Sequence, residues 1–533
     1  MADSLLEDKF VQTAVSRVQL RAERQQDIGQ LVETFVDPGI TVQLQNENNQ
    51  ILYGRRGTGK THVLRVVQSG ASSEPDALAV YVDMRRLGSS SVFNDEGRPT
   101  HVRVASLLRD VLAEVESALL EWATRPDSSV GSDVFEGLDA LSTAITRTVM
   151  SQVGVVEEAS TTADKSATRG AAVAISASPS LELSSKDETS LTDTEKLQRS
   201  GVEIEPLYFQ EIATALEGLF KKSGLSRLTV LLDEWTAIPL DLQPLFAEFL
   251  KRSLFPIPQI TVKIASLEYR SNFSERLEKN NVLGFELGAD ISSSLELDDY
   301  YVFDRNPERT IEMFSELLYR HVTAEIGSNG KSLYLSTEHG IATSGEFVKS
   351  LFASPEAFQE LVRAGEGVAR DLINIFGSAF FNSLRRKRKS IDRRAVQDAA
   401  REWYEKDKAP NVDQAQGRIL RRIVDDVIGT RKARSFLLEK ELETNEVIRS
   451  LFDFRIIHLV KRGFADKDNP GLRHNIYTLD YGCYVDLLGT QKAPGGDFTE
   501  ELATEGEEVV VPFDDRRSIR RIILRAEHLA SNQ

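Results

Sequence analysis

Several residue types are scarce in this sequence, and each scarcity excludes a class of protein. The single cysteine, Cys483, cannot form an internal disulfide or a thiolate metal cluster, so we expect it to be a lone buried thiol. No apolar run approaches the roughly 18 residues that a bilayer span requires, and we therefore expect no membrane partner. The first residues lack the basic and then apolar pattern of a signal peptide, which predicts a cytoplasmic protein.

Positive charge is in deficit over the whole chain. The sequence has 65 Lys and Arg against 82 Asp and Glu, which gives a net charge of −17. Because phosphate binding requires a surplus of positive charge at the contact face, this net charge disfavours indiscriminate coating of nucleic acid or anionic membrane, and any such contact has to be local. The length of 533 residues, 41% of them hydrophobic, predicts an ordinary folded protein with more than one domain.

Apolar strands alternate with amphipathic helices over residues 1–305. We expect strands at residues 50–53, 78–83, 228–232 and 260–265, and helices at residues 101–123, 206–222 and 241–255. Near-continuous apolar strands are typical of a parallel sheet that is covered on both faces. The predicted fold class is therefore α/β, with a doubly wound parallel sheet in this first domain.

The rest of the chain divides by composition. Residues 157–196 are dominated by Ala, Ser, Thr and Gly, which predicts a flexible insertion, because so few large apolar groups cannot offset the entropy of ordering. Helices follow one another over residues 306–410, including one expected at 344–364, and indicate a helical lid. Residues 411–490 combine helices, the last expected at 446–460, with a hairpin around a Pro-Gly turn, and so resemble a winged helix. An acidic and then basic tail covers residues 491–533.

The strongest motif is GRRGTGKT at residues 54–61, a full match to GxxxxGK[ST] between a predicted strand and a predicted helix. Its glycines let backbone N–H groups turn toward a phosphate chain, and the following helix directs the positive end of its dipole at the same charge. This context disfavours an unrelated glycine-rich turn. We expect Lys60 at the β- and γ-phosphates of a nucleoside triphosphate and Thr61 on Mg²⁺. The full set of predicted nucleotide-binding residues is Gly54, Arg55, Arg56, Gly57, Thr58, Gly59, Lys60, Thr61 and His62.

Two carboxylates, Asp233 and Glu234, directly follow the apolar strand at residues 228–232. They would lie at the carboxyl edge of the sheet, where open α/β folds collect their ligands. Asp233 would hold the water shell of Mg²⁺, and Glu234 would orient and partly deprotonate the attacking water. A solvated acidic turn is the alternative. Together with the phosphate loop, the pair favours hydrolysis of a nucleoside triphosphate, because phosphoryl transfer requires mainly positioning, a metal and neutralisation of charge.

The order of these motifs resembles that of the AAA+ ATPases, in particular the origin-recognition-complex branch and its bacterial stand-alone relatives. After GRRGTGKT come LTVLLDEW, ITVKIASLEYR, a lid segment at residues 365–371 and a small C-terminal region. The resemblance spans roughly residues 21–488. It implies ATP and Mg²⁺ as cofactors and a nucleotide-switched machine that assembles on double-stranded DNA, as a homo-oligomer or with a partner ATPase or effector. It also implies a role in mobile-element or phage-defence settings.

The same resemblance implies roles for individual residues. The family's sensor 1, which contacts the γ-phosphate and is more usually asparagine, corresponds here to Ser266 or Glu268. Its sensor 2 arginine corresponds to Arg370, which would couple the presence of the γ-phosphate to lid position and would be catalytic together with Lys60 and Glu234. A solvated arginine in a helical first turn is the alternative for Arg370. An arginine finger acting in a neighbouring subunit has the candidates Arg252, Arg270 and Arg276, among which spacing does not choose.

The densest positive run of the chain is Arg385, Arg386, Lys387, Arg388 and Lys389. Residues 382–473 contain 23 Lys and Arg against 15 Asp and Glu, in a chain that is acidic as a whole. This uneven distribution of charge favours a nucleic-acid-binding face at the basic run. The alternatives are that the run binds an acidic partner or the acidic tail, or that it is a solvated helix end. With a protein partner, the same ATPase would be a signal-transducing switch that binds a trigger or effector rather than DNA.

Overall fold

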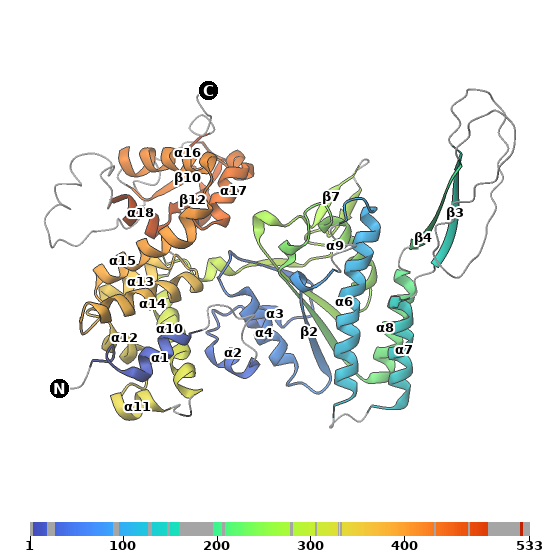
Figure 1. Ribbon diagram of the computed structural model, residues 1–533, viewed down its shortest axis with the longest axis horizontal. Coiled ribbons are helices and arrows are strands. Elements are labelled where there is room, and N and C mark those ends of the chain that lie inside the picture. Colours follow the sequence, from blue (N-terminus) through green and yellow to red (C-terminus); the bar gives the residue numbers. More distant parts are fainter. Residues whose placement is uncertain are drawn as a thin grey trace.

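The computed structural model describes most of the chain, and its described residues form three packed parts. They are residues 4–18, 27–88, 95–125, 130–146, 150–158, 196–204, 208–277, 281–303, 306–328, 330, 333–430, 433–466, 469–488 and 523–525. Figure 1 shows an α/β domain beside a helical lid, with a small C-terminal domain lying over the lid helices. Among these residues no helix is long and apolar enough to cross a membrane.

A five-stranded parallel sheet in the order β2-β5-β6-β1-β9 organises the α/β domain. Its strands are β1 (Gln50–Tyr53), β2 (Ala77–Asp83), β5 (Arg227–Asp233), β6 (Ile260–Ser266) and β9 (Ser293–Glu296). The first four agree with the predicted strands to within a residue at each end. β9 was not predicted, because its sequence, SSLE, has a single apolar residue. It adds to the free side of β1, which carries the phosphate loop at its end.

Both faces of this sheet are covered, as predicted. Leu52 and Leu231 pack on one face against α4 (Lys60–Ala71), whereas Ile51 and Leu232 pack on the other face against α6 (Thr100–Ala123) and α9 (Gln243–Ser253). All four leucine and isoleucine side chains are fully buried. Because neighbouring residues of a strand point to opposite faces, this division into two cores is what a doubly wound sheet requires.

Further elements surround the sheet. They are α2 (Ile28–Thr34), α3 (Thr41–Leu44), α7 (Ser132–Thr146), α8 (Phe209–Ser223) and the short ladder of β7 (Ser274–Arg276) with β8 (Val282–Gly284). An antiparallel pair, β3 (Met150–Glu158) and β4 (Lys196–Ile204), lies between α7 and α8 in the chain and projects away from the domain in Figure 1. The predicted insertion at 157–196 begins and ends in this pair, and its interior lies outside the described residues.

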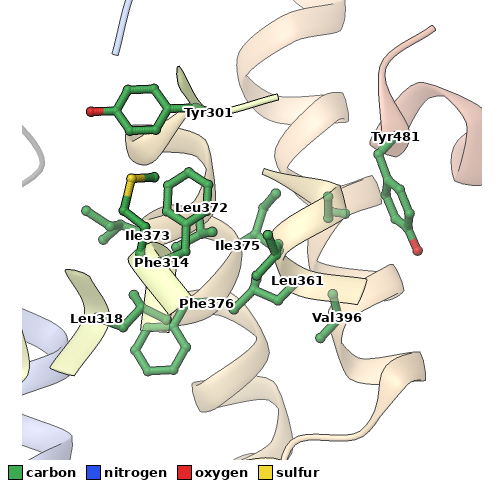
Figure 2. Close-up of a cluster of buried hydrophobic side chains, with 14 of the residues drawn as sticks. Tyr301, Phe314, Leu318, Leu361, Leu372, Ile373, Ile375, Phe376, Val396 and Tyr481 are labelled. Atoms are coloured by element: carbon green, nitrogen blue, oxygen red, sulfur yellow. The ribbon is translucent and has the colours of Figure 1, made fainter. Parts of the chain in front are cut away.

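Helices make up the lid. They are α10 (Pro307–Gly327), α11 (Tyr334–His339), α12 (Ser344–Leu351), α13 (Pro355–Ala364), α14 (Ala369–Arg385) and α15 (Arg393–Trp403), and the N-terminal α1 (Lys9–Arg17) packs against α10. Figure 2 shows Phe314 of α10, Leu361 of α13 and Phe376 of α14 meeting in its core. The single helix predicted at 344–364 is wrong. Pro355 disfavours helical geometry in the residue before it, and Ser354 instead caps a new helix.

The C-terminal domain combines helices with a four-stranded sheet in the order β11-β12-β10-β13. Its elements are α16 (Gln414–Ile423), β10 (Ser435–Leu438), α17 (Glu446–Asp453), β11 (Ile457–Ala465), β12 (Arg473–Leu479), α18 (Tyr481–Leu488) and β13 (Ile523–Leu524). The antiparallel β11 and β12 form the predicted hairpin. The helix predicted at 446–460 is wrong in its second half: α17 ends at Asp453, Arg455 has a φ of 61°, and the chain continues as β11. Cys483 is buried, as predicted.

Candidate nucleotide site

The phosphate loop adopts a conformation that its glycines permit. Gly57 and Gly59 have φ values of 89° and 103°, in the left-handed region that side chains disfavour, and α4 begins immediately afterwards at Lys60. The Lys60 Nζ donates to the carbonyl oxygens of Gly54 at 2.6 Å and Arg55 at 3.1 Å. Burial lowers the pKa of Lys60, whereas Asp233 and Glu234 act to raise it. The loop, the helix N-terminus and this ammonium group therefore lie together.

Asp233 and Thr61, 172 residues apart, are in direct contact. The Thr61 hydroxyl donates to Asp233 Oδ2 at 2.6 Å, and the backbone N–H of Glu234 donates to Asp233 Oδ1 at 2.8 Å. The Tyr81 hydroxyl, on the neighbouring strand β2, also donates to Oδ2, at 2.7 Å. A hydroxyl beside a carboxylate is the oxygen ligand set that Mg²⁺ prefers when phosphates complete its coordination, so these residues fit the ion. Tyr81 was not predicted, because its link to Asp233 depends on the pairing of β2 with β5.

Glu234 lies at the carboxyl edge of the sheet in a strained conformation. Its φ of 55° is unusual for a residue other than glycine, and strain of this kind is concentrated at functional sites. Burial and then the charge of Asp233 raise the pKa of Glu234. Arg85, which follows β2 and was not predicted, lies with its Nη1 3.7 Å from Glu234 Oε1 and is held by Asp83 at 2.7 Å. A carboxylate with a raised pKa is suited to accept a proton from water.

Arg370 brings the lid into contact with the phosphate loop. Its backbone N–H, in the first turn of α14, donates to the carbonyl oxygen of Gly57 at 3.1 Å. A Cβ added at Gly57 would lie 2.8 Å from the Cβ of Arg370, so glycine is required for this close approach. The charge of Arg370 also lowers the pKa of Lys60. The lid arginine and the loop lysine are therefore parts of one electrostatic environment.

The two sensor 1 candidates differ in their surroundings. Ser266, the last residue of β6, is paired in register with Tyr53 of β1, and its hydroxyl contacts that of Ser271 at 2.6 Å. Glu268 is instead bound through both carboxylate oxygens by Arg462 of the C-terminal domain, at 2.8 and 2.6 Å. Ser266 is thus placed at the strand end beside the loop, whereas Glu268 takes part in a contact between domains.

The finger candidates also differ. Arg252 pairs with Glu248 of its own helix at 2.6 Å, and Arg276 is exposed in β7. Arg270 pairs at 2.6 Å with Asp453 at the end of α17. In this arrangement the Arg270 guanidinium is used within its own chain, and α17 is docked against the segment that follows β6.

Three predicted loop side chains point in different directions. The His62 ring lies beside Phe35, and its Nε2 donates to the carbonyl oxygen of Leu31 at 2.5 Å, so any nucleotide contact of His62 would come from its backbone. Arg56 is exposed. The Arg55 side chain is buried and turns toward the lid and the C-terminal domain.

The basic run lies at the end of α14 and is partly neutralised. Arg386 pairs with Asp398 at 2.9 Å, Arg388 pairs with Asp392, and Arg385 donates to Asn382. Lys387 and Lys389 are exposed. The predicted nucleic-acid candidates therefore fall into two groups, arginines with partners nearby in the chain and exposed lysines.

Comparison with known proteins gives one match to a family and many to solved structures. The family model described as ORC-CDC6-like matches residues 19–86. Comparison with the curated proteins gave no match. The solved structures include the ORC2 protein of Aeropyrum pernix in ADPNP and ADP complexes, with 11% identity, 90% of this chain and 96% of that chain covered, and a TM-score of 0.33.

Two further solved structures are similar to the same extent. Cdc6p from Pyrobaculum aerophilum has 12% identity, covering 90% of this chain and 96% of that chain, with a TM-score of 0.31. The Aeropyrum pernix ORC1 protein in complex with DNA has 15% identity, covering 90% of this chain and 94% of that chain, with a TM-score of 0.29. The segment that carries the phosphate loop is similar to the ORC-CDC6-like family model, and this match confirms the resemblance that the motifs predicted.

Proposed function

We propose that this protein is a Mg²⁺-dependent AAA+ ATPase that binds and hydrolyses ATP. The observation that carries the proposal is the 2.6 Å contact between Thr61 and Asp233, because it joins the phosphate loop to the carboxyl edge of β5. A phosphate chain in the loop would lie at the N-terminus of α4, where backbone N–H groups and the helix dipole favour negative charge. Lys60 would exchange its carbonyl partners for phosphate oxygens.

The residues around this point supply the remaining parts of phosphoryl transfer. Mg²⁺, when bound, neutralises phosphate charge, and Thr61 and Asp233 are the side chains that would hold it. Glu234 would orient the attacking water and accept its proton. Arg370 would contact the γ-phosphate from the lid, so that lid position follows the state of the nucleotide.

Replacement of Lys60 tests nucleotide binding itself. Lys60→Ala is expected to weaken ATP binding at least about tenfold, because it removes a charged hydrogen-bond donor to phosphate. Affinity is measured by titration with a fluorescent ATP analogue, and turnover by phosphate release. Lys222→Ala removes the same charge from α8 and is the control. Native affinity in Lys60→Ala would contradict the proposal.

We further propose that the ATPase acts on double-stranded DNA through the end of α14. Support comes from the exposed Lys387 and Lys389 in the most basic span of an acidic chain. Assembly as an oligomer and a role in mobile elements or phage defence stay predictions. The second candidate, a switch that binds a protein, is favoured by the docking of α17 on the α/β domain through Asp453 and Arg270.

The salt dependence of duplex binding tests whether the end of α14 contacts DNA or an acidic protein. Replacing both Lys387 and Lys389 by alanine is expected to weaken duplex binding and to reduce the slope of log affinity against log salt by about 1.8, because each lost phosphate contact removes about 0.9. The control, Lys221→Ala with Lys222→Ala, removes two exposed lysines from α8 and should leave the slope unchanged. The measurement is a fluorescence-anisotropy titration at several salt concentrations. Equal slopes for the two double variants would favour the protein-binding switch.

A further inference from the structure

One side chain of the phosphate loop enters a buried interface between three parts of the molecule. The Arg55 residue is only 4% exposed, and its Nη2 donates to the carbonyl oxygen of Glu366 in the lid at 2.9 Å. Its Nη1 donates to Nδ1 of His458 in the C-terminal domain, and its Nε lies 3.3 Å from Asp298 Oδ1 beyond β9. Arg55 therefore joins the loop to the lid, the C-terminal domain and the edge of the sheet.

His458, the second residue of β11, is held in one orientation and one tautomer. It is 2% exposed; Nδ1 accepts from Arg55, and Nε2 donates to Asp480 Oδ2 at 3.0 Å. These two roles require a neutral ring with its proton on Nε2. Burial lowers the pKa of His458 to about 3, which is consistent with a neutral ring at physiological pH. Burial acts against ionisation of Asp480, but Lys408 and His458 together hold its pKa well below its usual range.

The buried network continues from Asp480 back to the nucleotide site. The Lys408 Nζ contacts Asp480 and also lies 3.0 Å from Asp371 Oδ2. Asp371 is fully buried, pairs with Arg455 as well, and follows Arg370 directly in α14. The N–H of Arg370 donates to the carbonyl oxygen of Gly57. The network of contacts therefore reaches the phosphate loop at two residues, Arg55 and Gly57.

Arg55 also fixes groups that surround the expected phosphates. Its carbonyl oxygen accepts from the Thr58 hydroxyl at 2.9 Å and from Lys60 Nζ at 3.1 Å, and its backbone N–H donates to Asp298 Oδ2 at 2.9 Å. A change in the backbone of Arg55 would therefore move the acceptor that Thr58 and Lys60 share. The contacts of the Arg55 side chain restrain the residue whose backbone supplies this acceptor.

We infer that His458 is a positioning residue for the nucleotide: by accepting a hydrogen bond from Arg55, it keeps the phosphate loop in the shape that binds ATP. The C-terminal domain is then a component of the ATP site in the same chain, in addition to any partner that it binds. This inference rests on the proposed ATP binding, and His458 acts through Arg55, without itself touching the nucleotide.

The inference can be tested with two substitutions of His458, each of which keeps one of its two hydrogen bonds. In His458→Asn the side-chain oxygen lies near the position of Nδ1 and can still accept from Arg55, whereas in His458→Gln the amide reaches the position of Nε2 and can still donate to Asp480. We expect His458→Gln to raise the dissociation constant for a fluorescent ATP analogue about tenfold, and His458→Asn to recover most of the affinity. Thermal unfolding without nucleotide is measured in parallel.

A double-mutant cycle keeps the test independent of folding. If His458 acts through Arg55, then Arg55→Met with His458→Gln will bind ATP no more weakly than Arg55→Met alone. Additive losses, equal affinities of the Asn and Gln variants, or native affinity in His458→Gln would each overturn the inference. Failure of the unsubstituted protein to bind the analogue would instead overturn the proposed function, so the two failures are distinguishable.

Discussion

Glu234→Gln is expected to lower the rate of ATP hydrolysis by a factor of about 10² to 10⁴, the usual contribution of a general base, and to leave ATP affinity nearly unchanged. The amide keeps the size of the side chain and its position at the strand end but cannot accept a proton from water. Phosphate release under saturating ATP measures the rate, and titration with a fluorescent ATP analogue measures the affinity. The matched control is Glu217→Gln, an exposed glutamate of α8.

The pH dependence of the unsubstituted protein provides a second readout of the same group. Burial and Asp233 raise the pKa of Glu234 above its ordinary value. Because a general base works in its ionised form, turnover should be complete above this raised pKa and should be lost as the pH falls through it. The acidic limb should therefore lie at higher pH than for an ordinary glutamate, and it should disappear in Glu234→Gln. Negligible phosphate release from both the unsubstituted protein and Glu234→Gln would identify a nucleotide-binding scaffold, whereas equal and measurable turnover in the two would show that Glu234 has no catalytic role.

Asp371→Asn is expected to destabilise the protein by about 3 to 5 kcal/mol, because it leaves two buried cations without their shared counter-ion. The Asp371 carboxylate is fully buried between Lys408 and Arg455. The shift in the urea concentration at the unfolding midpoint is measured by tryptophan fluorescence. We expect the unfolding midpoint of the lid and the C-terminal domain to shift most, because Asp371 lies in α14 and both cations lie beyond residue 403.

A surface pair provides the comparison for this variant. Asp398 pairs with Arg386 at 2.9 Å, but its side chain is 25% exposed and that of the arginine 48%. Water and salt screen such a pair, so Asp398→Asn should cost about 1 kcal/mol or less. If both variants unfold at the same urea concentration, the buried network is not important for stability.

The parts of the site that could be predicted from the sequence are those that depend on local pattern. The phosphate loop is specified by the spacing of its glycines and lysine, and Asp233 by its place after an apolar strand. The fold class followed from the same strands. The strand β9 was missed because three of its four residues are polar. The end of α17 was missed because a short apolar run such as residues 456–460 fits a helix or a strand equally well.

The remaining contacts join residues that are distant in the sequence, and no local pattern could reveal them. Arg55 and His458 are 403 residues apart, and each has an ordinary explanation by itself, as a loop cation and as a core histidine. Tyr81 is an unremarkable strand residue until β2 pairs with β5. Burial explains why these links are specific: a charged or polar group that leaves water requires a defined partner.

The way in which the lid and the C-terminal domain share their interior limits how the polypeptide can be divided. Lys408 contacts Asp480, the Tyr481 hydroxyl donates to Glu360, and Gly482 lies so close to Ala400 that a Cβ there would be 2.4 Å from its carbonyl oxygen. A fragment that stops near residue 410 would keep acids and lysines whose partners had been removed, together with an uncovered apolar surface. Recombinant expression, crystallisation trials and gene fusions should therefore retain both halves, because neither can be expected to stay in solution alone.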